Sequence, residues 1–483
     1  MSIQEEQLQQ LIDLEYDSDF IEEIKVSKQL LPDTIPEKLI DQFVEVIKQS
    51  FFQEIEVADL IKIKLESEDI IPLYTELFTL KKYLTKHDLD RFEDLGIGIT
   101  NAQRIIPQLI HLLNFNDIPL IQYDVLWILG NLATLGAFDK LIIQNDGVYV
   151  IIQKLNSSYQ QIALQASWTL GNITIEGDLQ QICRNQVRQK GGVELILNLL
   201  NKLQDPKIIE QCFWSINNIC SDGISFLRKE TVNMIIQQLC ICLNKFDDEI
   251  LIVTCLQSLC QSIPSSQENY NVILEQKITP KLLNLIFHKN RRISLRSFEL
   301  INHLIECGGE ICDHILSFKF LEVVANFLKE DRSKINKINI LSCILQICKG
   351  TESQQKALVE NQIIVQEIFQ QLQLLKNLKI KHILSSLANL ALSKNKDVII
   401  ILVQNQIISH FIHFFDQLQD DELFEEMLKG LENIISVIKT QFENYNIKDL
   451  ITQKEQNQIL EIYQTDKFIK LRKYVDQIVL QLQ

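Results

Sequence analysis

Residues 126–132 read LWILGNL, and two similar stretches follow, SWTLGNI at 167–173 and FWSINNI at 213–219. In each stretch a Trp is followed four residues later by an Asn, and apolar residues recur at intervals of three and four. This periodicity is typical of an α-helix with one buried face and differs from the strict alternation of a half-buried strand. The three stretches therefore predict the same helix, used three times.

Weaker copies of this motif continue in both directions along the chain. They read LKKYLTK (80–86), LQSLCQS (256–262), FELINHL (298–304), LSCILQI (341–347), LSSLANL (384–390) and LKGLENI (428–434). Successive copies lie 41 to 46 residues apart, and such regular spacing indicates a tandem repeat. The residues at the position of the Trp are Lys81, Trp127, Trp168, Trp214, Gln257, Glu299, Ser342, Ser385 and Lys429.

Each motif is preceded by another apolar segment of helical period, for example VYVIIQKLN (148–156) and VELILNLLN (193–201). One short helix and two longer ones are therefore expected in each repeat, which at this length is typical of armadillo and HEAT repeats. We predict an all-α fold, a right-handed armadillo-repeat superhelical solenoid of about nine to ten repeats of ~43 residues. Gly147 and Gly191–Gly192 are expected at the turn between the first two helices of a repeat, where a positive φ favours Gly.

The two ends of the chain differ from the repeats. Residues 1–60 carry 15 Asp or Glu, four Lys and no Arg, which gives −11 of the net charge of −16. We expect 1–60 to form an acidic N-terminal arm and a capping helix, with the first 20 residues mobile. The armadillo-repeat domain is expected over 61–483, and its last segment, 445–483, is expected to form capping helices.

Composition disfavours several classes of function. Pro and Gly make up only 22 of 483 residues, too few for a β-sandwich or a loop-rich fold. The net charge of −16 disfavours nucleic-acid binding. Because no signal-peptide pattern and no run of 18 apolar residues occurs, we expect a soluble intracellular protein without membrane contact. The 11 Cys form no CxxC pair and no catalytic motif is found, so we expect no metal, no cofactor and no enzyme activity.

All three Trp residues of the chain belong to a Trp/Asn pair. A spacing of four places both side chains on one helix face, and stacked repeats would align the pairs into a ladder. Asn amides match the N–H and C=O groups of an extended peptide, and Trp rings can hold the stem and charge of Lys or Arg. The alternative is that the Trp side chains fill the core between repeats and each Asn bonds a neighbouring turn.

The stretches at 121–155 and 163–200, which hold the first two pairs, resemble importin α, the armadillo adaptor of nuclear protein import. The resemblance extends over residues of about 65–480. It implies that the pairs form the major binding site for nuclear localisation signals. It also implies a carboxylate that meets the central Lys of the signal, at Glu176, and a further carboxylate at the equivalent Asp222. The alternative for both acids is a solvated place in a loop. The residues carried over from the family are Trp127, Asn131, Trp168, Asn172, Glu176, Trp214, Asn218 and Asp222.

Two features depart from the family pattern. The family's N-terminal arm is basic and binds importin β, whereas 1–60 is acidic and lacks Arg, which argues against binding of importin β through this arm. The family's minor site reuses Trp/Asn pairs in the seventh and eighth repeats. Here those positions read Ser342/Gln346 and Ser385/Asn389, so Ser385 and Asn389 remain as the candidates for a minor site.

The residues and the resemblance together predict an importin-α-like adaptor for nuclear protein import. It would bind a basic, mainly monopartite localisation signal in a concave Trp/Asn groove and shuttle between cytoplasm and nucleus. The sequence leaves open whether an importin-α export receptor is a further partner. The alternatives are an armadillo-repeat scaffold in the cytoplasm or cytoskeleton with no transport role, and a carrier that crosses the nuclear pore without importin β.

Overall fold

The structure is a computed structural model of the chain, and its secondary structure is helical throughout the described residues. The chain divides into two compact units, Met1–Ser258 and Leu259–Gln483, and each unit is a stack of helices. The described residues are 18–32, 34–51, 65, 67, 69–86, 96, 98–135, 138–175, 179–261, 266–330, 334–374, 378–415, 420–441, 452 and 455–457.

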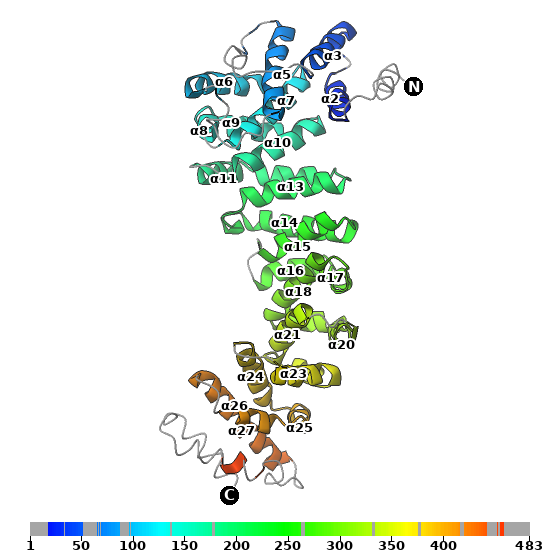
Figure 1. The fold of residues 1–483 in the computed structure, drawn as a ribbon, viewed down its shortest axis with the longest axis vertical. Coiled ribbons are helices and arrows are strands. Elements are labelled where there is room, and N and C mark those ends of the chain that lie inside the picture. Colours follow the sequence, from blue (N-terminus) through cyan, green and yellow to red (C-terminus); the bar gives the residue numbers. More distant parts are fainter. Residues whose placement is uncertain are drawn as a thin grey trace, which may run out of the picture. The chain divides into compact units, whose positions relative to one another are not determined.

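The first unit contains the N-terminal helices and the repeats with the three Trp residues (Figure 1). Its motif helices α5, α7, α10 and α13 pack against one another in chain order. The helices are α2 (Ser18–Gln29), α3 (Glu37–Phe51), α5 (Ile70–Lys86), α6 (Gly98–Leu112), α7 (Pro119–Ala133), α8 (Phe138–Gln144), α9 (Gly147–Lys154), α10 (Gln160–Ile173), α11 (Gln180–Gln189), α12 (Gly192–Leu200), α13 (Pro206–Ile219), the 3₁₀ turn Ile224–Phe226, α14 (Lys229–Lys245) and α15 (Glu249–Gln261), which runs past the boundary.

The second unit repeats the same order of helices, and its motif helices α18, α21, α24 and α27 again pack in sequence. The predicted motif positions of both units all fall on helices. The helices of the second unit are α16 (Gln267–Glu275), α17 (Thr279–Leu285), α18 (Arg291–Glu306), α19 (Gly309–Ser317), α20 (Phe320–Glu330), α21 (Lys334–Cys348), α22 (Glu352–Val359), α23 (Gln362–Leu374), α24 (Leu378–Ala391), α25 (Lys396–Gln404), α26 (Ile407–Phe415) and α27 (Asp421–Gln441).

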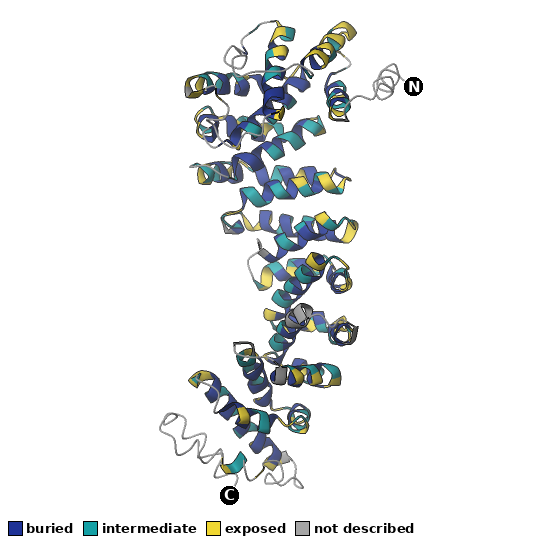
Figure 2. Ribbon diagram, viewed as in Figure 1, coloured by how far each residue is buried: buried dark blue, intermediate teal, exposed yellow. Residues whose placement is uncertain are grey.

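The core of each unit lies between successive helices, where Figure 2 shows continuous buried faces. In α10, for example, Ile162, Ala166, Leu170 and Ile173 are fully buried. Burying one Ile or Leu side chain contributes about 1.5–3 kcal/mol. Because each helix buries this face only against its neighbours, stability in such a stack is the sum of local contacts.

Local sequence sets where the motif helices begin. Helix α13 starts at Pro206. Proline suits this position because it has no backbone N–H, and the N–H groups of the first turn find no partner within the helix. The preceding Asp205 accepts a hydrogen bond from the backbone N–H of Lys207 at 2.9 Å and so caps the helix. Helix α7 likewise starts at a proline, Pro119.

The turn between the first two helices of a repeat needs a left-handed residue, as predicted, but the residue is not always the glycine. Gly191 takes this conformation, with φ of 76°. In the preceding repeat the prediction for Gly147 is wrong, because Asp146 takes the positive φ of 57°. Gly147 is instead helical, and a Cβ there would lie 2.8 Å from Cδ1 of Ile110. In the last repeat Gln406 takes φ of 58°.

The ends of the chain are described in part. The first 20 residues, predicted to be mobile, lie outside the described residues up to 17, whereas 18–20 open helix α2. Within the segment 1–60, predicted as an arm with a capping helix, the structure describes α2 and α3, and α3 ends at Phe51. Residues 52–60 lie outside the described residues. The capping helices predicted at 445–483 lie outside the described residues, apart from 452 and 455–457.

Within the described part of the chain, no single helix is long and apolar enough to cross a membrane. Helices α25 and α26 pass the length and hydropathy criteria only as a pair bent by 66°. The apolar side chains of α26, among them Ile407, Phe411 and Phe415, are buried in the second unit.

Candidate functional site

The three Trp side chains occupy the same position on consecutive motif helices. Trp127 lies on α7, Trp168 on α10 and Trp214 on α13, and each is half-buried. We call these residues and the Asn residues four positions later the Trp/Asn ladder, and its members are Trp127, Asn131, Trp168, Asn172, Trp214 and Asn218.

Each of the last two Trp rings packs over a glycine of the preceding motif helix. A Cβ added to Gly130 of α7 would lie 2.5 Å from Cζ3 of Trp168. A Cβ added to Gly171 of α10 would lie 2.6 Å from Cζ3 of Trp214. Any side chain at these positions would therefore collide with the indole. The Gly that directly precedes Asn131 or Asn172 therefore leaves the space that the Trp ring of the next motif helix fills. The sequence pattern did not reveal this role.

The Asn side chains of the ladder have three different environments. The Nδ2 of Asn131 donates to the backbone oxygen of Trp127 in its own helix at 2.8 Å. Asn172 is buried, and its Nδ2 donates to the backbone oxygen of Gly130 at 3.1 Å, which links α10 to α7. The Nδ2 of Asn218 is buried and has no hydrogen-bond partner among the described residues. Asn218 is therefore the ladder amide with an unused buried donor.

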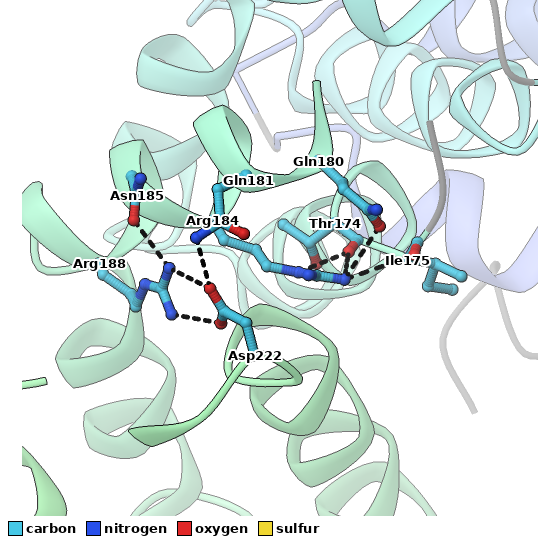
Figure 3. A network of polar contacts seen from close by, with 8 residues as sticks. All are labelled: Thr174, Ile175, Gln180, Gln181, Arg184, Asn185, Arg188 and Asp222. Carbon is cyan, nitrogen blue, oxygen red and sulfur yellow. Dashed lines mark hydrogen bonds and ion pairs between the residues drawn. The ribbon is translucent and has the colours of Figure 1, made fainter. Parts of the chain in front are cut away.

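A polar network lies beside the last step of the ladder (Figure 3). Arg188 of α11 donates to both carboxylate oxygens of Asp222, at 2.6 and 3.0 Å. The Nε2 of Gln181 donates to the same carboxylate at 2.8 Å. These hydrogen bonds, first of all those from Arg188, lower the pKa of Asp222. The predicted site residue Asp222 is therefore already paired with a cation of its own chain.

The second arginine of α11 holds the loop that follows the Trp168 helix (Figure 3). Arg184 is buried, and its Nε and an Nη donate to the backbone oxygen of Thr174 at 3.0 and 2.8 Å. This loop leads to the predicted site residue Glu176, which lies outside the described residues. The arginines of α11 were not predicted, because they are far from the ladder motif in sequence.

The region predicted as a minor site lacks aromatic side chains at the ladder positions. Ser385 and Asn389 are half-buried on α24. The hydroxyl of Ser385 donates to Glu426 of α27 at 2.8 Å. The Nδ2 of Asn389 donates to the backbone oxygen of Ser385 at 2.8 Å, the same bond within a helix that Asn131 makes. The two predicted residues thus lie together, next to a carboxylate and without a ring.

A buried ionic cluster at the start of the ladder was not predicted. Lys81 of α5 lies 2.7 Å from Oδ1 of Asp124 and 2.6 Å from Oε1 of Glu23 of α2. Tyr74 donates its hydroxyl hydrogen to Oδ2 of Asp124 at 3.0 Å. Burial raises the pKa of Asp124 to about 6, against the opposing effect of Lys81. Burial alone lowers the pKa of Lys81, but Asp124 and Glu23 more than offset this and raise it.

Among the described residues, no group of three or more His, Cys, Asp or Glu side chains is placed to hold a metal ion. All Cys side chains except Cys307 are buried, and none of the eleven forms a disulfide. Burial raises the pKa of most of these thiols, for instance that of Cys343 to about 12. They behave as small apolar side chains of the core.

The helical repeats and the stacked motif helices define the class of protein, an all-α armadillo-repeat solenoid. Two solved structures share this fold over 89% of the chain. One is an engineered protein with a TM-score of 0.63 and 18% identity, covered over 99% of its length. The other comes from a study of the interaction between cadherin and β-catenin, with a TM-score of 0.62, 14% identity and 81% of its length covered.

Comparison of the amino-acid sequence with curated proteins shows similarity to importin α subunits. Importin subunit alpha-1b of Oryza sativa subsp. japonica is 23% identical over 232 residues, 48% of this chain and 42% of the relative. Importin subunit alpha-8 of Arabidopsis thaliana is 25% identical over 288 residues, 60% of this chain and 61% of the relative. The chain therefore spans about half the length of these curated relatives. No family model matches the chain. The chain is a divergent armadillo-repeat protein that resembles importin α subunits.

Proposed function

We propose that the Trp/Asn ladder binds a basic, mainly monopartite nuclear localisation signal and that the protein is an importin-α-like adaptor for nuclear import, without enzyme activity. The observation that carries the proposal is the placement of all three Trp residues of the chain at one position of consecutive motif helices, each half-buried. Pure core packing would favour full burial of such large apolar rings. Their partial exposure leaves ring surface for a ligand.

The ladder offers two kinds of contact to an extended basic peptide. The indole faces attract a Lys or Arg side chain by about 0.5–2 kcal/mol per contact. The Nδ2 of Asn218, and the Nε2 of Gln165 one turn before Trp168, are buried donors without a hydrogen-bond partner among the described residues. A rotation of these side chains would bring their amide hydrogens to peptide carbonyl groups. An unsatisfied buried donor costs about 1–3 kcal/mol, and a bound peptide would recover part of that cost.

The charges around the ladder modify the family pattern. Because Arg188 already neutralises Asp222, this carboxylate anchors α11 instead of meeting a peptide Lys. Cation binding in this proposal rests on the Trp faces and on Glu176.

Shuttling between cytoplasm and nucleus and contact with an importin-α export receptor belong to the same proposal. Binding of importin β through the acidic segment 1–60 does not, and Ser385 with Asn389 would give only a weak minor site.

The test is fluorescence anisotropy with a labelled Lys-rich monopartite signal peptide near physiological salt, and a Lys-to-Ala peptide as the control. We expect binding in the micromolar range or tighter for the first peptide only. The double variant Trp168→Ala/Trp214→Ala should bind about tenfold more weakly or worse, which corresponds to ~1.4 kcal/mol. Tyr149→Ala, an exposed aromatic residue on α9, is the matched control and should bind as the wild type does. Equal binding by the double variant would refute the site.

A second candidate, an armadillo scaffold without a transport role, is favoured by one observation. The side-chain donors of Asn131 and Asn172 are used within the protein, as expected if the ladder serves packing. Under this alternative a folded protein binds neither peptide. Its partners would then be sought among cytoplasmic or cytoskeletal proteins.

A further inference from the structure

The residue at the ladder position of the first repeat is a lysine. Lys81 precedes Trp127 by one repeat, and its side chain lies between α5, α7 and α2. Its Nζ is 2.7 Å from Asp124 of α7 and 2.6 Å from Glu23 of α2. The charge of Lys81 is therefore met by two carboxylates, the arrangement expected for a tightly bound cation.

Aromatic rings surround the same ammonium group. The Nζ of Lys81 lies 5.6, 5.5 and 5.9 Å from the ring centroids of Phe78, Tyr123 and Trp127. These distances fall within the range of about 6 Å at which a ring face attracts a cation. The first Trp of the ladder thus already contacts a lysine, and this lysine belongs to the chain itself. This is the contact that the proposed function assigns to a peptide lysine.

Helix α2 covers this lysine. Lys81 is only 5% exposed, and Phe20 and Ile24 of α2 are fully buried. The end of α2 also reaches the start of α10, where the Nε2 of Gln161 donates to Oε1 of Gln29 at 2.8 Å. Figure 1 shows α2 beside α7 and α10 in the first unit. The ladder position one repeat before Trp127 is therefore occupied by Lys81 and covered by α2.

We infer that Lys81 is a built-in ligand that fills the first cation slot of the ladder, and that α2 seals this slot. The peptide site then begins after Trp127. It offers two cation slots, one between Trp127 and Trp168 and one between Trp168 and Trp214. The inference rests on the proposed peptide-binding function, and it limits the number of lysine side chains of the signal that the ladder can bind. Two lysine positions of the peptide determine affinity, and a third is excluded by the protein's own Lys81 side chain.

The slot can be tested without any peptide. Lys81→Ala removes the side chain beyond Cβ, which is three carbons and the ammonium group. The space that remains matches 1-propylammonium, and the carboxylates of Glu23 and Asp124 lose their cation. We expect 1-propylammonium chloride to raise the unfolding temperature of Lys81→Ala, while 1-propanol does not. The wild type and Lys140→Ala, an exposed lysine on α8, serve as controls and should not respond. No stabilisation by 1-propylammonium would overturn the assignment of a cation slot.

The limit on the signal is tested by a lysine scan. Each Lys of a labelled Lys-rich peptide is replaced by Ala in turn, and binding is measured by anisotropy. For the wild type we expect two positions at which replacement costs about tenfold. Because α2 covers the slot, Lys81→Ala alone should keep two sensitive positions. When Lys81→Ala is combined with Phe20→Ala and Ile24→Ala, which loosen α2, a third position should become sensitive. The same two positions in this triple variant would overturn the inference while leaving the proposed function intact. Absence of binding by every protein would overturn the proposed function, and this limit with it.

Discussion

The packing of Trp168 on Gly130 makes a sharp prediction for the variant Gly130→Ala. In an exposed helix interior, replacing Gly by Ala stabilises by about 1 kcal/mol, because Ala loses less backbone freedom on folding. Here the new Cβ would lie 2.5 Å from Cζ3 and 2.9 Å from Cε3 of Trp168, far inside contact distance. The ring is rigid, so either the indole or helix α10 must move.

The expected free energies are worked out as follows. Overpacking in a well-packed site costs about 1–3 kcal/mol. Set against the gain in helix propensity of about 1 kcal/mol, the net change for Gly130→Ala is a loss of about 0–2 kcal/mol in the free energy of unfolding. In the background Trp168→Ala the collision is absent, so the same substitution should stabilise by about 1 kcal/mol. The coupling energy between the two sites is then about 1–3 kcal/mol.

The assay is urea unfolding of the wild type, the two single variants and the double variant, followed by far-UV circular dichroism. Peptide anisotropy on the same four proteins adds a functional readout, since a displaced Trp168 ring should weaken binding. Additive free energies, with Gly130→Ala stabilising the wild type by the full helix-propensity gain, would refute the stacked ladder. The parallel substitution Gly171→Ala, against Trp214, repeats the test one step further along.

Three further predictions concern the polar contacts of the ladder. Arg188→Ala should lower the free energy of unfolding by about 1.5–3 kcal/mol, since the carboxylate of Asp222 loses its cation and both hydrogen bonds from Arg188, and urea unfolding measures this loss. The pKa of Asp222 is lowered in the folded protein, so its carboxylate stabilises the fold above pH ~4 and that stabilisation is lost as the pH falls below this value. Accordingly, the stability difference between wild type and Asp222→Asn should be constant from pH 5 to 7 and shrink toward pH 3, and a pH-independent difference would contradict the ion pair. Asn172→Ala should cost about 1–2 kcal/mol in thermal or urea unfolding because it leaves the buried oxygen of Gly130 without its side-chain donor, and no loss would contradict that bond.

The positions of the motif helices were predictable because helical periodicity and a fixed repeat length are properties of the local sequence. Trp127, Trp168 and Trp214 were expected on one face, and the structure places them at one position of three consecutive motif helices, α7, α10 and α13. The environment of each Asn was not predictable. Asn131 bonds within its own helix and Asn172 bonds across to α7, although both follow the same motif.

The contacts that were missed join residues far apart in the sequence. Asp222 was expected to meet a peptide, but Arg188, 34 residues away, already binds it. Lys81 was placed at the ladder position, but its partner Glu23 lies 58 residues away in a segment without the repeat. Periodicity predicts which way a side chain faces. It does not predict which charged partner the folded chain brings to it.

The central claim is that a basic peptide binds on the ladder itself. The three Trp residues of the chain all lie in the ladder, so intrinsic Trp fluorescence reports on this site alone. A Lys-rich peptide without Trp should change the emission in a saturable way, with the same dissociation constant as the anisotropy titration, while the Lys-to-Ala peptide leaves it unchanged. Peptide binding by anisotropy without any change in Trp emission would place the peptide elsewhere on the protein and contradict the account.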